Sequence, residues 1–385
     1  MSIPARPYPA DLRLLTALRA FAALLVVLFH FADRTAPGSG LHTTLIGHGQ
    51  LGVDVFFVLS GFILAHVYLA RVEAGRFAHG EFLVNRLARL YPMHLLMLAV
   101  AIANGWLSMH RGLPVEVYGP PLGIDPSTGG GFGRHLLSNL LLLQAWGADN
   151  GHYFNAVSWS ISAEGFAYLL FPAIAGVALL FGKKSSLRLI SAVLFYVCCE
   201  TLAQVVLGAG LNDLSWRYGI ARILPEFALG VAFYGFGLTK PMPAATLRWL
   251  TPAVIAQALL MMASGAPVAL MPPVFGLVIM LLANCEREGV VPPAWLLKPS
   301  VYLGEISYST YMLHLLLGKI YFNALSRLAG YDPHALPAWQ AVLAIVPMIL
   351  ASAVTFHLIE QPGRRLLKTA LQPLLAAQPK AAPAC

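Results

Sequence analysis

The sequence predicts an all-α polytopic integral membrane protein of about ten transmembrane helices with a short re-entrant or interfacial helix. Two observations support this fold class, one on composition and one on pattern. Of the 385 residues, 58% are hydrophobic and only 11% are charged, whereas soluble domains hold about 25% charged residues. Apolar runs of about 18 residues, the length that crosses a bilayer as a helix, recur along the whole chain. These features exclude an ordinary soluble enzyme.

Ten apolar runs separated by polar breaks are expected to cross the membrane. In chain order they are Leu14–Phe31, Leu51–Ala70, Pro92–Ser108, Ser158–Phe181, Leu187–Gly208, Tyr218–Leu238, Leu247–Met262, Val268–Asn284, Val301–Leu325 and Trp339–Ile359. A further apolar stretch, His135–Trp146, would extend only about 18 Å as a helix, against about 30 Å of hydrocarbon. This stretch is therefore expected to be re-entrant or interfacial on the outer face.

The basic residues predict the orientation of these spans. If His135–Trp146 does not cross, one side of the membrane receives 17 of the 25 lysine and arginine residues. The positive-inside rule then places that side, and both termini with it, in the cytoplasm. If the stretch crosses, Lys183, Lys184 and Arg188 move outside and the bias weakens. We expect an integral protein of a bacterial inner (plasma) membrane.

The net charge of +8 is spread between the apolar runs. The basic residues are therefore expected to face anionic membrane lipid, and nucleic acid is not an expected partner. Residues 1–370 are predicted to form one transmembrane domain, and the Pro- and Ala-rich residues 371–385 a disordered cytoplasmic tail. The cysteines show no disulfide framework and no metal-ligand spacing. They are Cys198, Cys199, Cys285 and Cys385. No metal and no permanently bound cofactor are expected.

Two ionisable residues share one face of the first span. Arg19 and His30 are eleven residues apart, which is three helical turns plus about 20°, with about 16 Å between them along the axis. The arginine lies toward the cytoplasm and the histidine toward the outside. Ionisable side chains inside a span are candidates for function because their insertion is costly. The alternative is an arginine that snorkels and a histidine at the interface.

Asp54 near the outer end of the second span is expected at a depth similar to that of His30. A carboxylate there would orient the imidazole and stabilise its charged form during general-base catalysis. The alternative is an acidic residue that interacts favourably with the N-terminus of its own helix. The neighbouring pair Ser60 and Gly61 is expected to allow close helix packing.

Arg86 and Arg89 lie three residues apart just before the third span. Two guanidinium groups at this spacing are suited to binding phosphate. Anchoring of the span by the positive-inside rule explains both arginines equally well.

Ser160 and Glu164 lie one turn apart at the start of the fourth span. Glu164 has no cation within its own helix and needs a partner from elsewhere, because an unpaired carboxylate in a membrane is costly. The candidate partners are His30, Arg222 and Lys319.

Further polar residues lie in later spans. Ser307, Tyr311 and His314 form a stripe along one face of the ninth span, which either lines a cavity or packs against another helix; we favour the cavity. Arg222 and Glu226 are spaced as a structural ion pair. Glu360, followed by Gln361 and Pro362, is expected to cap the last span.

Six segments of this chain, in this order, resemble the membrane-bound acyltransferase 3 family. They are Arg19-x10-His30, GVDVFFVLSGF, Arg86-x2-Arg89-x2-Pro92, SWSISAEGFAYLLFP, SYSTYMLH and Glu360-Gln361-Pro362. The resemblance runs from about Leu12 to Arg365. Gly165 and Ala167 stand where the family usually has a second acidic residue and an aromatic one, so a role that needs two carboxylates is in doubt, whereas a role for Glu164 alone is not.

The resemblance implies transfer of an acyl group, commonly acetyl from acetyl-CoA, to a hydroxyl of a carbohydrate, a lipid-linked sugar or another cell-surface or secreted molecule. It also implies that Arg19 and His30 are essential. The predicted site has three parts. They are catalytic His30, Asp54 and Glu164; donor-binding Arg19, Arg86 and Arg89; and acceptor-binding or cavity-lining Ser160, Ser307, Tyr311 and His314.

Two mechanisms and a rival function stay open at this stage. The acceptor hydroxyl attacks the thioester directly after His30 deprotonates it, or the acyl group passes first to an enzyme side chain. We favour direct attack because no thiol and no obviously activated serine lies beside His30. The rival function is a transporter or flippase of a glycolipid or polysaccharide unit, which broken helices duplicated in two halves would support.

Overall fold

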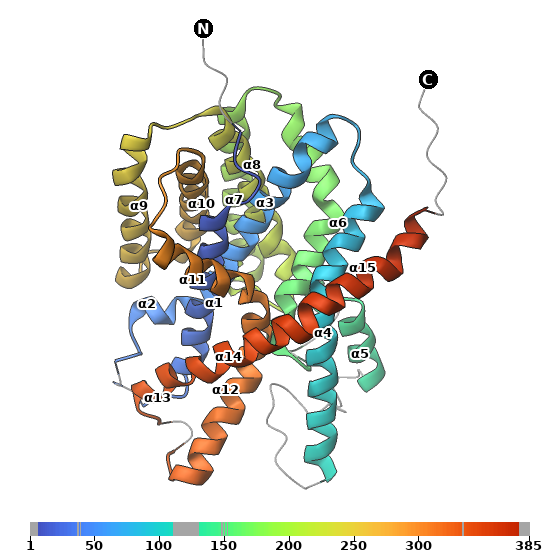
Figure 1. Cartoon of the computed structure of the whole chain (residues 1–385), viewed down its shortest axis with the longest axis vertical. Helices are drawn as coiled ribbons and strands as arrows, with labels where there is room; N and C mark the ends of the chain where they lie inside the picture. Colours follow the sequence, from blue (N-terminus) through green and yellow to red (C-terminus); the bar gives the residue numbers. More distant parts are fainter. Residues whose placement is uncertain are drawn as a thin grey trace.

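The computed structural model describes residues 7–376, apart from 37, 39, 111–130, 148, 150, 152 and 333–334. Residues 377–385 of the predicted tail, which include Cys385, lie outside this part of the chain. Within it the chain is a bundle of helices (Figure 1). Nine helical segments of the described chain are long and apolar enough to cross a membrane. The predicted fold class is therefore confirmed.

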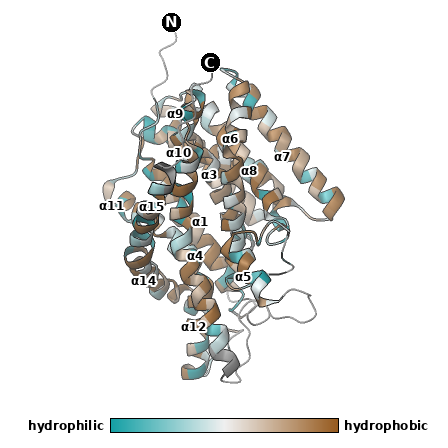
Figure 2. Cartoon of the chain, turned by 90° about the vertical axis from the view of Figure 1, so that its right-hand side faces the viewer, coloured by the Kyte–Doolittle hydropathy of each residue, from teal (hydrophilic) through white to brown (hydrophobic). Residues whose placement is uncertain are grey.

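Eight of these nine segments each centre on a single helix close to a predicted span. They are α1 (Arg13–Ala32), α3 (Gly52–Glu73), α4 (His79–His110), α6 (Trp159–Leu180), α7 (Ser185–Leu207), α8 (Gly219–Thr239), α9 (Ala244–Ser264) and α10 (Met271–Arg287). Helix α7 lies at the periphery of the bundle and is largely hydrophobic (Figure 2). Large apolar side chains along it, such as Leu194 and Val205, are exposed. Such a surface suits contact with lipid.

The predicted span Val301–Leu325 is two helices, which corrects the sequence analysis. They are α11 (Ala294–Glu305) and α12 (Ser307–Ala329). At the break, the Ser307 hydroxyl donates to the Gly304 carbonyl at 2.7 Å. The 23 residues of α12 are enough to cross a bilayer, but this helix carries polar side chains and is not one of the nine apolar segments.

The last apolar segment is a chain of four helical pieces that runs obliquely across the others (Figure 1). The pieces are α13 (Ala338–Leu343), α14 (Ile345–Thr355), the π-helical η7 (Phe356–Glu360) and α15 (Gln361–Ala376). A π-helical turn carries an extra residue and often marks a functional site. Helix α15 continues past the predicted start of the tail at residue 371.

The short apolar stretch forms α5 (Phe132–Leu140), a helix of nine residues that would extend only about 14 Å. It packs on α4, where His94 Nε2 lies 2.8 Å from the Asn139 carbonyl oxygen. The chain then returns inward through the 3-10 turn η4 (Ala156–Ser158), and Ser158 at its end is buried. Helix α6 therefore begins inside the protein rather than at its surface.

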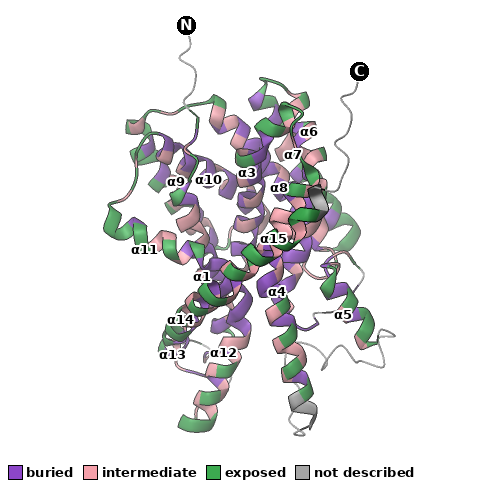
Figure 3. Cartoon of the chain, turned by 45° about the vertical axis from the view of Figure 1, so that its right-hand side comes forward, coloured by how far each residue is buried: buried purple, intermediate pink, exposed green. Residues whose placement is uncertain are grey.

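The buried centre of the molecule lies along α3 and α8 (Figure 3). Glycines allow these two helices to approach backbone to backbone. A Cβ atom at Gly61 would overlap the Phe227 carbonyl, and one at Gly230 would overlap the Val58 carbonyl. The predicted close packing at Gly61 is therefore confirmed, and this contact fixes α3 beside the site described next.

Candidate active site

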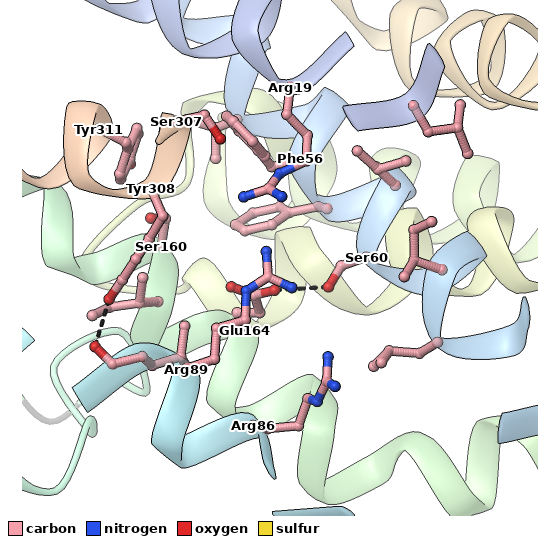
Figure 4. Close-up of a pocket in the computed structure, with 18 of the residues that line it drawn as sticks. Arg19, Phe56, Ser60, Arg86, Arg89, Ser160, Glu164, Ser307, Tyr308 and Tyr311 are labelled. Atoms are coloured by element: carbon pink, nitrogen blue, oxygen red, sulfur yellow. Dashed lines mark hydrogen bonds between the residues drawn. The ribbon is translucent and has the colours of Figure 1, made fainter. Parts of the chain in front are cut away.

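A cavity of about 180 Å³ lies between α1, α3, α4, α6 and α12 (Figure 4). Apolar side chains, Phe56 and Phe57 among them, form part of its wall. Seven of the ten predicted site residues line this cavity. They are Arg19, Arg86, Arg89, Ser160, Glu164, Ser307 and Tyr311. The structure thus brings the predicted donor-binding arginines together with Glu164, while His30, Asp54 and His314 lie outside the cavity lining.

The three arginines approach the cavity from two helices. The guanidinium groups of Arg19 on α1 and Arg89 on α4 point into it from opposite sides (Figure 4). The Nε atoms of Arg19 and Arg86 are buried and make no hydrogen bond to any described residue. Arg86 lies over the ring of Tyr68 at 5.7 Å, and its Nη2 is 3.5 Å from the Tyr68 hydroxyl. Buried donors without partners are costly, so these groups are placed to receive an acceptor-rich ligand.

Glu164 is held in the cavity by hydroxyl groups. Ser60 Oγ donates to Glu164 Oε1 at 2.7 Å, and Tyr168 Oη donates to the same oxygen. The carboxylate also interacts electrostatically with Arg19 and Arg89.

These partners differ from those that the sequence suggested for Glu164, namely His30, Arg222 and Lys319. The reason is the depth of α6. Because η4 is already buried, the first turns of α6 lie at the level of Arg19 rather than at that of His30.

Glu360 was expected only to cap the last span, and the structure places it beside the same arginines. Its side chain is buried, accepts from Ser309 Oγ at 2.6 Å, and interacts electrostatically with Arg19 and Arg89. It comes from the π-helical turn η7. Three arginines thus face two carboxylates, Glu164 and Glu360, and the remaining positive charge favours an anionic ligand.

Three further residues of the site were not identified from the sequence. Ser60 was assigned to packing because it lies beside the helix-packing Gly61, but its hydroxyl donates to Glu164. Tyr168 lies one turn after Glu164, a spacing that could have indicated the contact. Tyr308 lines the cavity and donates to the Leu90 carbonyl at 2.6 Å, which ties α12 to α4.

The partner of His30 is a second histidine. His30 Nδ1 lies 3.2 Å from His314 Nε2 on α12, and 2.9 Å from the Val26 carbonyl oxygen of its own helix. Tyr311 connects this pair to the cavity, because its side chain lines the cavity and its carbonyl oxygen lies 2.6 Å from His314 Nδ1.

Asp54 does not orient His30, which corrects the sequence analysis. Arg222 donates to both of its carboxylate oxygens, from Nη2 to Oδ2 at 2.6 Å and from Nε to Oδ1 at 3.0 Å. Asn212 Nδ2 also donates to Oδ1 at 2.8 Å. The predicted pair of Arg222 and Glu226 is present as a longer contact of 3.9 Å. A forked guanidinium satisfies a buried carboxylate better than a single imidazole nitrogen does.

Ser307 and Tyr311 of the predicted polar stripe line the cavity, whereas His314 of that stripe does not. Ser160 lines the cavity from α6. The hydroxyls of the three lining residues are used locally. Ser160 Oγ donates to the Val157 carbonyl at 3.1 Å and Tyr311 Oη donates to the same oxygen at 3.2 Å. They hold η4 against α12. Their contribution to acceptor binding stays a prediction.

Comparison with known proteins relates this chain to acyltransferases. Residues 13–357 match an acyltransferase domain of the acyltransferase 3 family. The chain is 28% identical to the acyltransferase MdmB of Streptomyces mycarofaciens, over 92% of each chain. It is 26% identical to the O-acetyltransferase OatA of Staphylococcus aureus over 42% of this chain and 24% of that protein.

A shorter relative is protein 2 in the picA locus of Rhizobium radiobacter, 36% identical over 36% of this chain and 66% of that protein. No solved structure matches the chain. The domain match covers most of the sequence and includes every helix that lines the cavity. The chain is therefore a membrane acyltransferase of the acyltransferase 3 family.

Proposed function

We propose that this acyltransferase is an O-acyltransferase that moves an acyl group, acetyl in the first instance, from acyl-CoA on the cytoplasmic side of the membrane to a hydroxyl group. The acceptor is a carbohydrate, a lipid-linked sugar or another cell-surface or secreted molecule. One observation carries the proposal: a single helix, α1, presents Arg19 to an arginine-rich cavity and His30 eleven residues further on.

The arginines suit the donor. Guanidinium groups bind phosphate oxygens in forked pairs, and Arg19, Arg86 and Arg89 converge on one cavity. The cavity, at about 180 Å³, is smaller than the usual ligand pocket of about 300–1,000 Å³, so a whole CoA extends beyond it. Arg19 and His30 are about 16 Å apart along α1, a separation of the order of an extended pantetheine arm, so a CoA with its phosphates on the arginines brings its thioester toward His30.

His30 then acts as the general base. It removes the proton of the acceptor hydroxyl, the oxygen attacks the thioester carbonyl carbon, and the C–S bond breaks. The sulfur leaves as thiolate and takes up a proton, so that CoA-SH and an O-acyl ester are the products. No acyl-enzyme is needed. No cysteine is present among the described residues that line the cavity, and the described cysteines Cys198, Cys199 and Cys285 lie elsewhere.

The relatives support acyl transfer over the rival function. Both relatives named for an activity are acyltransferases, one of them an O-acetyltransferase. Neither of these activities is that of a transporter or flippase. Acetyl-CoA is a co-substrate in this proposal and not a permanently bound cofactor.

Donor binding by the purified protein tests this proposal. Replacing Arg86 and Arg89 together by alanine is expected to weaken acetyl-CoA binding by more than tenfold, since each charge-assisted contact contributes about 1.5–3 kcal/mol. Arg76→Ala is the matched control, because Arg76 is an exposed arginine in the segment between α3 and α4. It should bind as the wild type does. If the double variant folds and binds acetyl-CoA normally, the two arginines only anchor the span.

A further inference from the structure

The contacts of His30 and His314 determine which ring nitrogens carry hydrogen. His30 Nδ1 lies against the Val26 carbonyl oxygen at 2.9 Å, and His314 Nδ1 lies against the Tyr311 carbonyl oxygen at 2.6 Å. A carbonyl oxygen can only accept a hydrogen bond. Each Nδ1 must therefore carry a hydrogen, because a bare nitrogen at these distances would set two lone pairs against each other.

This protonation leaves one arrangement for the neutral pair. In a neutral imidazole one nitrogen donates and the other accepts. His314 Nε2 is then a bare acceptor, and it lies 3.2 Å from His30 Nδ1. The His30 Nδ1–H is shared between this acceptor and the Val26 carbonyl. His30 Nε2 is left with a free lone pair, and it makes no hydrogen bond to any described residue.

We propose that His314 is a positioning residue that fixes His30 in the tautomer with Nδ1 protonated and Nε2 free to act as the base. When Nε2 takes the proton of the acceptor hydroxyl, the Nδ1–H bond to His314 becomes charge-assisted and strengthens. His314 thus does for His30 what the sequence analysis expected of Asp54. This assignment rests on the proposed function of His30 as general base.

The burial of His314 agrees with a positioning role and not with acceptor binding. His314 has no exposed surface, whereas His30 is half-buried. An acceptor can therefore approach His30 but not His314. The sequence analysis placed His314 with the acceptor-binding or cavity residues, and the structure moves it behind His30.

No described carboxylate is as close a partner for His30 as His314 is. Asp33 interacts with it electrostatically from the end of its own helix, and Asp54 on α3 is bound by Arg222. The short elements α2 (Thr44–Gly47), η1 (Gly49–Leu51) and α13, which also pack on α1, carry no ionisable side chain. The second imidazole is the side chain that holds Nδ1–H, together with the Val26 carbonyl oxygen of the helix itself.

A set of three substitutions at one position tests the acceptor role. His314→Gln places an amide oxygen near the position of Nε2, whereas the shorter His314→Asn reaches only the position of Nδ1, and His314→Ala removes both. The Asn and Ala variants are expected to lower kcat by about 10–100-fold, the loss of one charge-assisted hydrogen bond. Their KM for acetyl-CoA should stay within about twofold, because the arginines are untouched. The Gln variant should recover most of kcat.

The proposal is overturned if the Gln variant is as slow as the Asn variant, or if all three keep the wild-type kcat. A wild-type protein that transfers no acyl group from acyl-CoA would contradict the proposed function. The assignment of His314 would then be decided by the ¹⁵N measurement of the His30 tautomer.

The tautomer itself can be measured without catalysis. The ¹⁵N spectrum of histidine-labelled wild-type protein, with a His30→Gln sample for assignment, should show His30 protonated at Nδ1 and bare at Nε2 in the neutral form. A neutral His30 protonated at Nε2 would overturn the proposal whether or not any His314 variant folds or turns over.

Discussion

Asp54 is fully buried, and the hydrogen bonds of its carboxylate go to Arg222 and Asn212 rather than to His30. Arg222 donates to both of its oxygens and Asn212 donates to one of them. Arg222 also donates to the carbonyl oxygens of Asn212 and Leu214. Arg222 therefore ties the start of α3 to the segment that precedes α8, and we expect the pair to be structural.

The first prediction at the residue scale concerns this network. Asp54→Asn keeps the shape of the side chain but leaves the buried Arg222 charge with only its longer contact to Glu226, and breaking a buried ion pair typically costs about 3–5 kcal/mol. We expect a large fall in the thermal stability of the purified protein and less protein in the membrane. The double variant Asp54→Asn, Arg222→Gln removes both charges of this pair and should recover part of that stability, because Glu226 then loses its contact with Arg222. A stable single variant that is merely slow would instead support a direct role of Asp54 in the chemistry.

Residue spacing predicted separations along one helix better than it predicted neighbours on other helices. The eleven-residue interval of Arg19 and His30 depends only on helix geometry, so their separation could be predicted. The partners of Asp54 and Glu164 come from other helices, and they depend on rotations and depths that the sequence does not specify. Glu164 meets Ser60 rather than His30 because α6 starts below the surface.

At the scale of elements, the crossing of α3 and α8 supports the site from behind. Gly61 follows Ser60, whose hydroxyl donates to Glu164, so any change in the distance between the two helices shifts a cavity residue. Most spans were predicted within a few residues because apolar length alone identifies them. The break at Ile306 and the π-helical turn at Glu360 were not, because both depend on local contacts between helices rather than on hydropathy.

The prediction at this scale is a substitution that adds one methyl group. Gly61→Ala places a Cβ against the Phe227 carbonyl, and overpacking of this kind typically costs about 1–3 kcal/mol. Thermal unfolding of the purified variant should show the loss, together with lower transferase activity. Gly176→Ala on α6 is the matched control, because a Cβ there meets nothing within 4 Å. Equal stability of the two variants would contradict the close packing.

At the scale of the whole molecule, the cavity exists only after five helices from distant parts of the chain have assembled. Its lining runs from Leu15 to Tyr311. The sequence motifs predicted seven of these lining residues, since each motif is local. They did not predict that Glu360 would join the arginines, because the oblique path of the last four helical pieces is a property of the assembled bundle.

Orientation in the membrane is the third prediction. With both termini in the cytoplasm, the exposed Lys183 at the end of α6 lies on the cytoplasmic side and the exposed Gly133 at the start of α5 on the outer side. Cysteines introduced at these positions, in a chain freed of its own cysteines, should react with an impermeant thiol reagent from opposite sides. Labelling of Lys183→Cys from the periplasmic side would reverse the proposed orientation.

The central claim is that the arginine cavity holds the donor while His30 performs the transfer. The most direct measurement compares acetyl-CoA binding with acyl transfer in His30→Ala and Arg19→Ala, with the acylated product followed by mass spectrometry of surface carbohydrate and secreted molecules. His30→Ala should bind acetyl-CoA normally and lose transfer by about 10²–10⁴-fold, the usual value of general-base assistance. Arg19→Ala should first raise the KM for the donor. Full acylation by His30→Ala, with the protein present at its normal level, would contradict the account.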